Sequence, residues 1–175
     1  MSLETTHGAP TYRFRAEDYA PAATATDVIS LGGVAGKVVR VQYVSVGGKA
    51  NTDSLIDVYM QKRSAANTGG TAANMLSAVS TLDSIDPRPI APLLLYSANP
   101  SALGASTTIN GDTLFLPGKS TPKGSPNRIE YTASPESKPC TLRNANEFFT
   151  VSLNGQAIPA GTELYISIEW TEDDV

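Results

Sequence analysis

Apolar and polar residues alternate along much of this chain, and the clearest alternation lies near its end. There the apolar positions are Leu164, Ile166, Ile168 and Trp170, and the polar positions between them are Glu163, Tyr165, Ser167 and Glu169. Because successive side chains of a β-strand point to opposite faces, this stretch predicts a strand with one buried and one polar face. Trp170 continues the apolar series, so we expect it in the core or at a subunit interface rather than on a sugar-binding surface. The acidic residues after it predict a solvated tail.

Other segments carry weaker versions of the same signal. Residues 37–46 are rich in β-branched side chains and apolar on both faces, which predicts a strand that is central in its sheet or covered on its outer side. Residues 54–63 predict a half-buried strand with Ile56, Val58 and Met60 on one face. Further strands are expected within residues 26–31, 93–96, 112–118, 128–133, 140–143 and 146–155. Residues 64–89 predict a long excursion with at most one or two helical turns.

Many short strands without alternating helices predict an all-β fold. The fold class that fits is an antiparallel β-sandwich, with a jelly roll as the expected topology. We expect one sandwich domain over residues 26–175 and an extended N-terminal arm with a linker over residues 1–25. Within the arm, TYRFR (11–15) could form a short strand, and APAATAT (20–26) is a linker of small residues. Such an arm needs a partner surface to become ordered.

Composition narrows the function classes. The 175 residues carry a formal net charge of −4, and the basic residues are scattered rather than gathered in one stripe, which argues against direct binding of nucleic acid. No apolar run approaches the roughly 20 residues that cross a membrane. The first residues lack a basic start followed by an apolar run, so we expect synthesis in the cytoplasm without a secretion signal.

Candidate chemistry is sparse. Cys140 and His7 are the only cysteine and the only histidine, which excludes an internal disulfide and a zinc site built from such residues. Catalysis by a Cys/His or Ser/His pair depends on His7, which lies in a polar leader that we expect to be solvated. The Asp-bearing loops at residues 81–87 and 110–112 lack the regular ligand spacing of a calcium loop, and turns explain them.

Paired carboxylates are the remaining enzymatic possibility. A glycosidase needs two of them at a separation of roughly 5 to 10 Å. The candidates are Asp57, Glu130, Glu147, Glu163 and Glu169. Glu163 and Glu169 share one strand face but lie about 20 Å apart, which is too far to act on one bond. We therefore expect solvated acids, no enzymatic activity, and no catalytic, cofactor or metal site. Tyr43, Tyr59 and Tyr165 fall on less apolar faces and are expected to contact a partner.

Four stretches together resemble a known family. They are DVYMQKRSAANTGGT (57–71), YSANPSALG (96–104), FFTVSLNG (148–155) and AGTELYISIEWTE (160–172). These phrases resemble small structural proteins of the virions of tailed bacteriophages and prophages, which are called capsid decoration or cement proteins. The resemblance spans about residues 26–172, and its phrases are strands and turns without a catalytic signature.

The resemblance implies a non-enzymatic protein on the capsid surface of a virion, which stabilises the head by bridging subunits of the major capsid protein. It also implies a homo-oligomer, with a trimer favoured. In the predicted arm, the expected partner contacts are Tyr12, Arg13, Phe14, Arg15 and Tyr19. The alternatives are a tail or baseplate accessory protein and a carbohydrate-binding module that recognises a receptor. A glycosidase is the third hypothesis.

Overall fold

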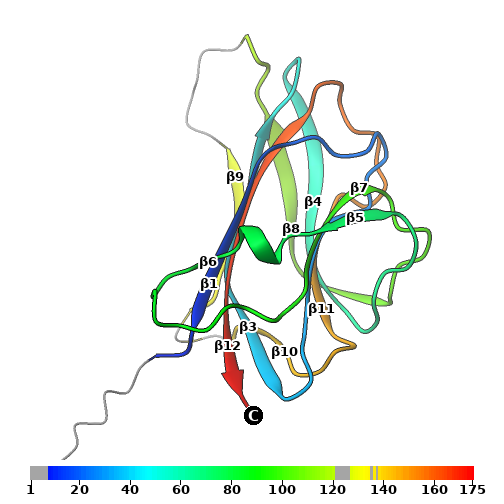
Figure 1. The fold of residues 1–175 in the computed structure, drawn as a ribbon. Helices are drawn as coiled ribbons and strands as arrows, with labels where there is room; N and C mark the ends of the chain where they lie inside the picture. Colours follow the sequence, from blue (N-terminus) through cyan, green and yellow to red (C-terminus); the bar gives the residue numbers. More distant parts are fainter. Residues whose placement is uncertain (1–7, 121–126, 135, 137) are drawn as a thin grey trace, which may run out of the picture.

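Two antiparallel β-sheets make up the computed structural model, which describes residues 8–120, 127–134, 136 and 138–175 (Figure 1). The first sheet contains β1 (Thr11–Tyr19), β3 (Lys37–Lys49), β6 (Ser80–Thr81), β9 (Arg128–Thr132), β10 (Cys140–Leu142) and β12 (Glu163–Asp174). The second contains β2 (Asp27–Gly32), β4 (Ser54–Arg63), β5 (Thr71–Asn74), β7 (Leu93–Ala98), β8 (Ser106–Leu116) and β11 (Phe148–Ser152). The prediction of an all-β fold with antiparallel strands is confirmed.

Strand order places elements from distant parts of the chain side by side. The first sheet runs β10, β3, β12, β1, β6, and β9 pairs with the same edge of β3 as β10 does. The second runs β5, β7, β2, β11, β4, β8. The excursion between β4 and β7 contains one turn of 3-10 helix, η1 (Leu76–Ala78), as the sequence predicts. β8 is longer than the predicted strand over residues 112–118.

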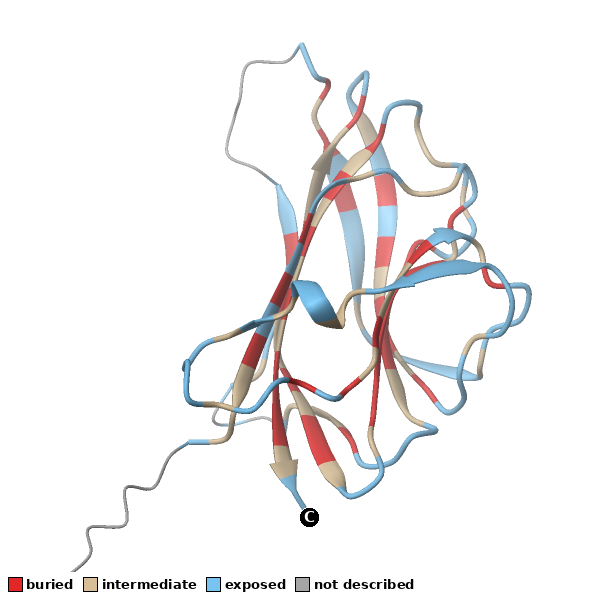
Figure 2. Cartoon of the chain, in the orientation of Figure 1, coloured by how far each residue is buried: buried red, intermediate tan, exposed pale blue. Residues whose placement is uncertain are grey.

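The hydrophobic core lies between the two sheets, and Figure 2 shows buried residues recurring along the strands of both. In β12 the predicted alternation is confirmed, because Leu164, Ile166, Ile168 and Trp170 are all fully buried. Trp170 packs against the ring of Tyr12 with a centroid distance of 5.8 Å. The prediction that Trp170 is a core residue is therefore confirmed.

A β-bulge explains why β3 is apolar on both apparent faces. Tyr43 pairs with Glu169 and Val41 pairs with Trp170, so Gln42 is an extra residue with no partner in β12. The bulge shifts the alternation by one position, and Val39 and Val41 before it face the core together with Val44 and Val46 after it. The strand is central in its sheet, as expected. It reads as apolar on both faces only because the residues that face the core occupy odd positions before the bulge and even positions after it.

The extended N-terminal arm expected over residues 1–25 is not confirmed. Residues 11–19 form β1, which pairs with β12 along most of its length and with β6 on its other edge. Tyr12 and Phe14 are buried and lie opposite Trp170 and Ile168. The two-sheet body therefore begins at Thr11 rather than at residue 26. Residues 1–7, with His7, lie outside the described residues, as do residues 121–126 of the loop after β8.

Candidate functional site

A polar hollow of about 430 Å³ lies on the outer face of the first sheet, across β9, β3, β12 and β1. Its lining includes the small residues Ser45, Gly47 and Ser167, which we call its floor. Its rim consists of Arg13, Arg15, Tyr43, Arg128, Tyr165 and Glu169. Because Ser45 and Ser167 lie opposite one another while longer side chains stand around them, this face is concave rather than flat.

Strand register creates this arrangement. Ser45 lies opposite Ser167, and Ser167 in turn lies opposite Arg15. Two residues further along β3, Gly47 lies opposite Tyr165. The bulge at Gln42 places Tyr43 on the outer face while Val41 before it and Val44 after it pack inward, which is a recognised effect of bulges beside functional sites.

Each arginine at the rim is paired with a carboxylate. Arg13 donates from Nε to Glu169 Oε1 at 2.8 Å and contacts the same oxygen from its NH2 group at 2.5 Å. The Nε atom of Arg128 lies 2.8 Å from Glu130, which also accepts the hydroxyl hydrogen of Tyr43 at 2.5 Å. Arg15 pairs with Glu17 at 3.0 Å. These contacts hold the rim side chains in defined positions.

A second charged group adjoins the hollow at Tyr165. The ammonium group of Lys49 lies 5.5 Å from the centre of the Tyr165 ring and 2.7 Å from Glu163. The Tyr165 hydroxyl donates to Asp18 at 3.1 Å. Hydrogen bonds from Lys119 and Lys49 lower the pKa of Glu163 to about 2. A general acid needs the opposite shift, so Glu163 is not suited to protonating a leaving group at neutral pH.

The other distinctive surface is the loop over residues 82–92, which connects β6 to β7 at the lower left of Figure 1. We call it the apolar loop. Leu82, Ile85 and Ile90 are exposed by 54%, 70% and 50%. Figure 2 shows most of the loop in the colour of exposed residues. Several large apolar side chains exposed on one short segment are typical of protein-binding surfaces.

Hydrogen bonds fix the apolar loop to the first sheet at three places. The amide of Leu82 donates to the carbonyl of Thr11 at 2.9 Å. The Tyr12 hydroxyl donates to the carbonyl of Pro87 at 3.0 Å. Glu172 accepts the amide hydrogens of residues 90 and 91, each at 3.1 Å, and the indole hydrogen of Trp170 at 3.0 Å. The loop therefore presents its apolar side chains from a fixed backbone.

Glu172 corrects the prediction of a solvated acidic tail. It is 3% exposed, because the alternation of β12 continues inward from Trp170 to Glu172. The next acid, Asp173, pairs with Arg40, and Asp174 pairs with Lys37 at 2.7 Å. The signal was present in the sequence, since Glu172 lies two positions after Trp170. It was missed because a carboxylate is rarely buried unless it is paired or hydrogen-bonded.

The structure divides the residues predicted to contact a partner. Arg13 and Arg15 are exposed and lie at the rim of the polar hollow, whereas Tyr12 and Phe14 are buried and face the core. The Tyr19 hydroxyl donates to the carbonyl of Tyr96 at 2.5 Å, which ties β1 to the second sheet. Partner contact through Arg13 and Arg15 remains a prediction, and Tyr12 instead positions the apolar loop.

Two phenols, the buried Tyr12 and the half-buried Tyr19, make the fold sensitive to high pH. Burial, followed by the negative charges of Glu172 and Asp86, raises the pKa of Tyr12 to about 12, and burial raises the pKa of Tyr19 to about 12. An unfolded chain ionises these phenols near pH 10, so their contribution to stability is fully present below pH 10 and is lost as the pH rises towards 12.

We therefore expect the urea midpoint of unfolding to fall steeply between pH 10 and pH 12. The double variant Tyr12→Phe/Tyr19→Phe should show a shallower fall over the same interval, since phenylalanine cannot ionise. Single replacement of the exposed Leu55 by Ala provides a control with the wild-type pH dependence. An equal slope in the double variant and the wild type would contradict the prediction.

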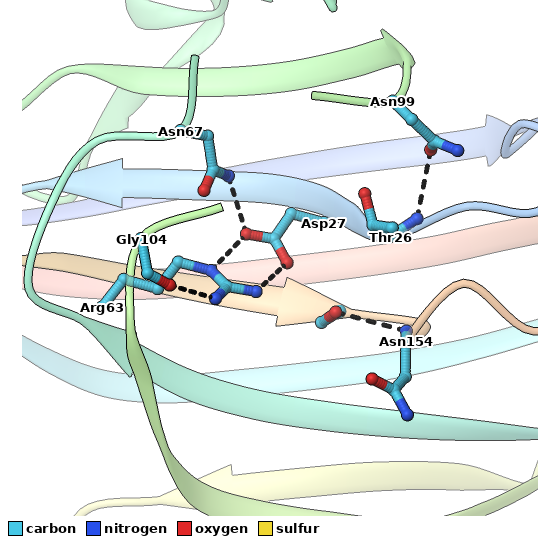
Figure 3. A network of polar contacts seen from close by, with 8 residues as sticks. Thr26, Asp27, Arg63, Asn67, Asn99, Gly104 and Asn154 are labelled. Atoms are coloured by element: carbon cyan, nitrogen blue, oxygen red, sulfur yellow. Dashed lines mark hydrogen bonds and ion pairs between the residues drawn. The ribbon is translucent and has the colours of Figure 1, made fainter. Parts of the chain in front are cut away.

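A buried ion pair that the sequence did not indicate lies on the second sheet (Figure 3). Arg63 donates from Nε and NH2 to the two carboxylate oxygens of Asp27, both at 2.6 Å. Its NH1 group donates to the carbonyl of Gly104 at 2.6 Å, and Asn67 donates to Asp27 at 2.7 Å. The network joins β2 and β4 to the loops at residues 64–70 and 99–105. Because its carboxylate is satisfied by fixed donors, we assign it a structural role.

The remaining predicted carboxylates, Asp57 and Glu147, each have a polar partner of their own. Asp57 accepts a hydrogen bond from Thr113, and Glu147 pairs with Lys62 at 2.8 Å. Burial raises the pKa of the Cys140 thiol to about 11, which keeps it in the weakly nucleophilic protonated form. Within the described ranges, no three His, Cys, Asp or Glu side chains gather as a metal-binding group.

Comparisons with known proteins add no relative. No protein-family model matches the chain, and no curated protein or solved structure matches it. In the part of the chain that the structure describes, no helix is long and apolar enough to span a membrane. The surfaces described above therefore carry the functional argument.

Proposed function

We propose that this protein is a non-enzymatic structural protein of a tailed-phage virion, which binds the major capsid protein and stabilises the head by bridging capsid subunits. The observation that carries the proposal is the apolar loop, whose exposed Leu82, Ile85 and Ile90 are held on a fixed backbone. The four phage-like phrases of the sequence support the same assignment. The jelly-roll topology expected for such a protein stays a prediction.

A fixed loop suits binding to another protein. Ordering a mobile segment on binding costs free energy, and the hydrogen bonds that this loop makes with Thr11, Tyr12 and Glu172 already restrict its backbone. A homotrimer presents three such loops at once, so modest contacts combine through effective concentration. This arrangement fits a position on the capsid surface over the junctions between capsomers.

The test is rebinding to virions from which the protein has been stripped. Replacing Ile85 with Asp places a charge at the most exposed of the three apolar positions, and we expect rebinding to weaken at least about tenfold, the effect of losing one contact of about 1.4 kcal/mol. Leu55→Asp is the matched control, because Leu55 is 65% exposed on β4, away from the loop. It should rebind like the wild type.

Other outcomes of the same preparation bear on the proposal directly. Absence of the chain from purified particles would contradict the proposal of a virion protein. Density on the tail or baseplate in a cryo-EM map replaces the head assignment with the tail accessory alternative. The mass of the protein in solution decides between a trimer and other oligomeric states. Equal rebinding of Ile85→Asp and the wild type removes the apolar loop from the interface.

A further inference from the structure

We propose that the polar hollow on the first sheet binds a neutral oligosaccharide, with Tyr43 and Tyr165 packing against sugar rings over a floor of Ser45, Gly47 and Ser167. This inference is independent of the proposed capsid contact, because the hollow lies on the outer face of β9, β3, β12 and β1, and the apolar loop lies between β6 and β7. Its volume of about 430 Å³ falls within the usual range of small-molecule sites.

Charge balance selects the class of ligand. The guanidinium groups of Arg13, Arg15 and Arg128 are matched one for one by Glu169, Glu17 and Glu130, so the three positive and three negative charges sum to zero. The adjoining group is balanced too, with Lys49 and Lys119 against Asp18 and Glu163. Glu169 lines the hollow, and Glu17 and Glu130 lie beside it. A site for phosphate, sulfate or nucleic acid needs positive charge that is not already paired, and each of these guanidinium groups is already paired with a carboxylate.

Hydrogen-bonding groups in the hollow suit hydroxyl-rich molecules. A sugar hydroxyl donates one hydrogen bond and accepts others, so it pairs best where donors and acceptors alternate. Each arginine–carboxylate pair offers both kinds of group side by side, and Ser45 and Ser167 add two hydroxyls at the floor. Because these pairs are already formed, the side chains need little reordering when a ligand enters.

The tyrosines supply the apolar part of the site. Tyr165 lies opposite Gly47, which is four residues from Tyr43 along β3, so the backbone positions of the two tyrosines are about 13 Å apart along the strand direction at 3.3 Å per residue. Their hydroxyls donate to Glu130 and Asp18, which orients both rings at the edges of the hollow. This spacing over a floor of small residues fits a chain of several sugar rings rather than a single one.

A second hollow of the described surface lacks these features. It has a volume of about 490 Å³ and is lined by polar residues that include Lys62, Arg63, Asn144 and Glu147, without an aromatic side chain. The Lys62 ammonium is already bound to Glu147 and to the carbonyl of Thr141. Aromatic side chains and balanced charges therefore occur together in the hollow of the first sheet and not in this one.

The experiment uses a glycan array that carries neutral oligosaccharides and bacterial surface polysaccharides beside sialylated and sulfated counterparts. The full-length wild type should bind neutral glycans, and Gly47→Gln should reduce that binding at least tenfold by filling the floor. The side chain fits there, since a Cβ atom at Gly47 lies at ordinary contact distances of 3.4 Å from Asn127 and 3.6 Å from Arg128. Gly8→Gln is the matched control, because a Cβ atom there meets nothing within 4 Å.

Two further variants distinguish a loss of glycan binding from a loss of folding. Tyr43→Ala and Tyr165→Ala should lose binding at least tenfold with unchanged circular dichroism, while Tyr59→Ala on the second sheet should bind like the wild type. Failure of the wild type to bind any neutral glycan, preference for the anionic glycans, or undiminished binding by Gly47→Gln each overturns the proposal. Gly47→Gln should still rebind stripped virions, and Ile85→Asp should still bind glycans, so the two proposals fail separately.

Discussion

Replacing Arg63 with methionine is expected to lower the free energy of unfolding by about 3–5 kcal/mol, the usual effect of removing one partner of a buried ion pair. The side chains of Arg63 and Asp27 are 5% and 0% exposed, so the Asp27 carboxylate is left without its counter-charge in a site that water does not reach. The carbonyl of Gly104 loses its donor in the same variant. Urea unfolding monitored by circular dichroism measures the change.

Arg15→Met is the matched control for this prediction. Arg15 and Glu17 are 61% and 63% exposed, and exposed ion pairs contribute about 0–1 kcal/mol. We therefore expect a change of less than about 1 kcal/mol in the control. A loss in Arg63→Met as small as that in Arg15→Met would show that the Asp27 network does not hold the loops at residues 64–70 and 99–105.

Replacing Phe14 with alanine is expected to destabilise the fold by about 3–5 kcal/mol. Phe14 is 2% exposed, lies opposite Ile168 in the register of β1 with β12, and belongs to the core between the sheets. The loss arises from the removed apolar surface and from the cavity that the ring leaves behind. Thermal or urea unfolding of the purified variant checks the value.

This variant also separates the two accounts of the N-terminal region. An arm that becomes ordered only on a partner contributes nothing to the stability of the free protein, so Phe14→Ala would then unfold like the wild type. Arg13→Ala, one position away and facing outward in the hollow, is the control and should change stability by about 1 kcal/mol or less. Equal stability of Phe14→Ala and the wild type would support the interpretation of this region as an arm.

Several elements could be predicted from the sequence because their signals are local. In β12 and β4, the alternation of apolar and polar residues predicted both the strand and the side chains that face the core, including Trp170 and Met60. The β-branched residues of β3 predicted a strand in the same way. Such patterns need no knowledge of the neighbouring strand, because they follow from the geometry of one extended backbone.

Other features were missed because a second, distant segment creates them. TYRFR alternates as a strand should, but the small residues after it suggested a detached arm, and only the pairing with β12 shows that Tyr12 and Phe14 belong to the core. The bulge at Gln42 left no simple pattern in β3. Partners for Glu172 and Asp27 come from the apolar loop and from Arg63, and neither contact has a sequence motif.

The candidate sites divide in the same way. Alternation placed Tyr165 on the polar face of its strand, whereas Tyr43 was predicted to contact a partner from a strand that reads as apolar on both faces. Arg13 and Arg15 were identified as partner-binding candidates within the predicted arm. The sequence did not show that these four side chains surround one hollow. They lie on three strands whose order, β3, β12, β1, differs from their order in the chain.

By itself, the sequence determined the all-β class, the strand faces of β4 and β12, the burial of Trp170 and the shortage of catalytic side chains. These follow from alternation, β-branched residues and composition, which act over a few neighbouring positions. The tertiary structure alone decided that residues 11–19 close the first sheet, that Arg13 meets Glu169 across 156 positions of the chain, and that Glu172 fixes the apolar loop. Contacts of that kind depend on strand order and register, which are set by how the whole chain packs.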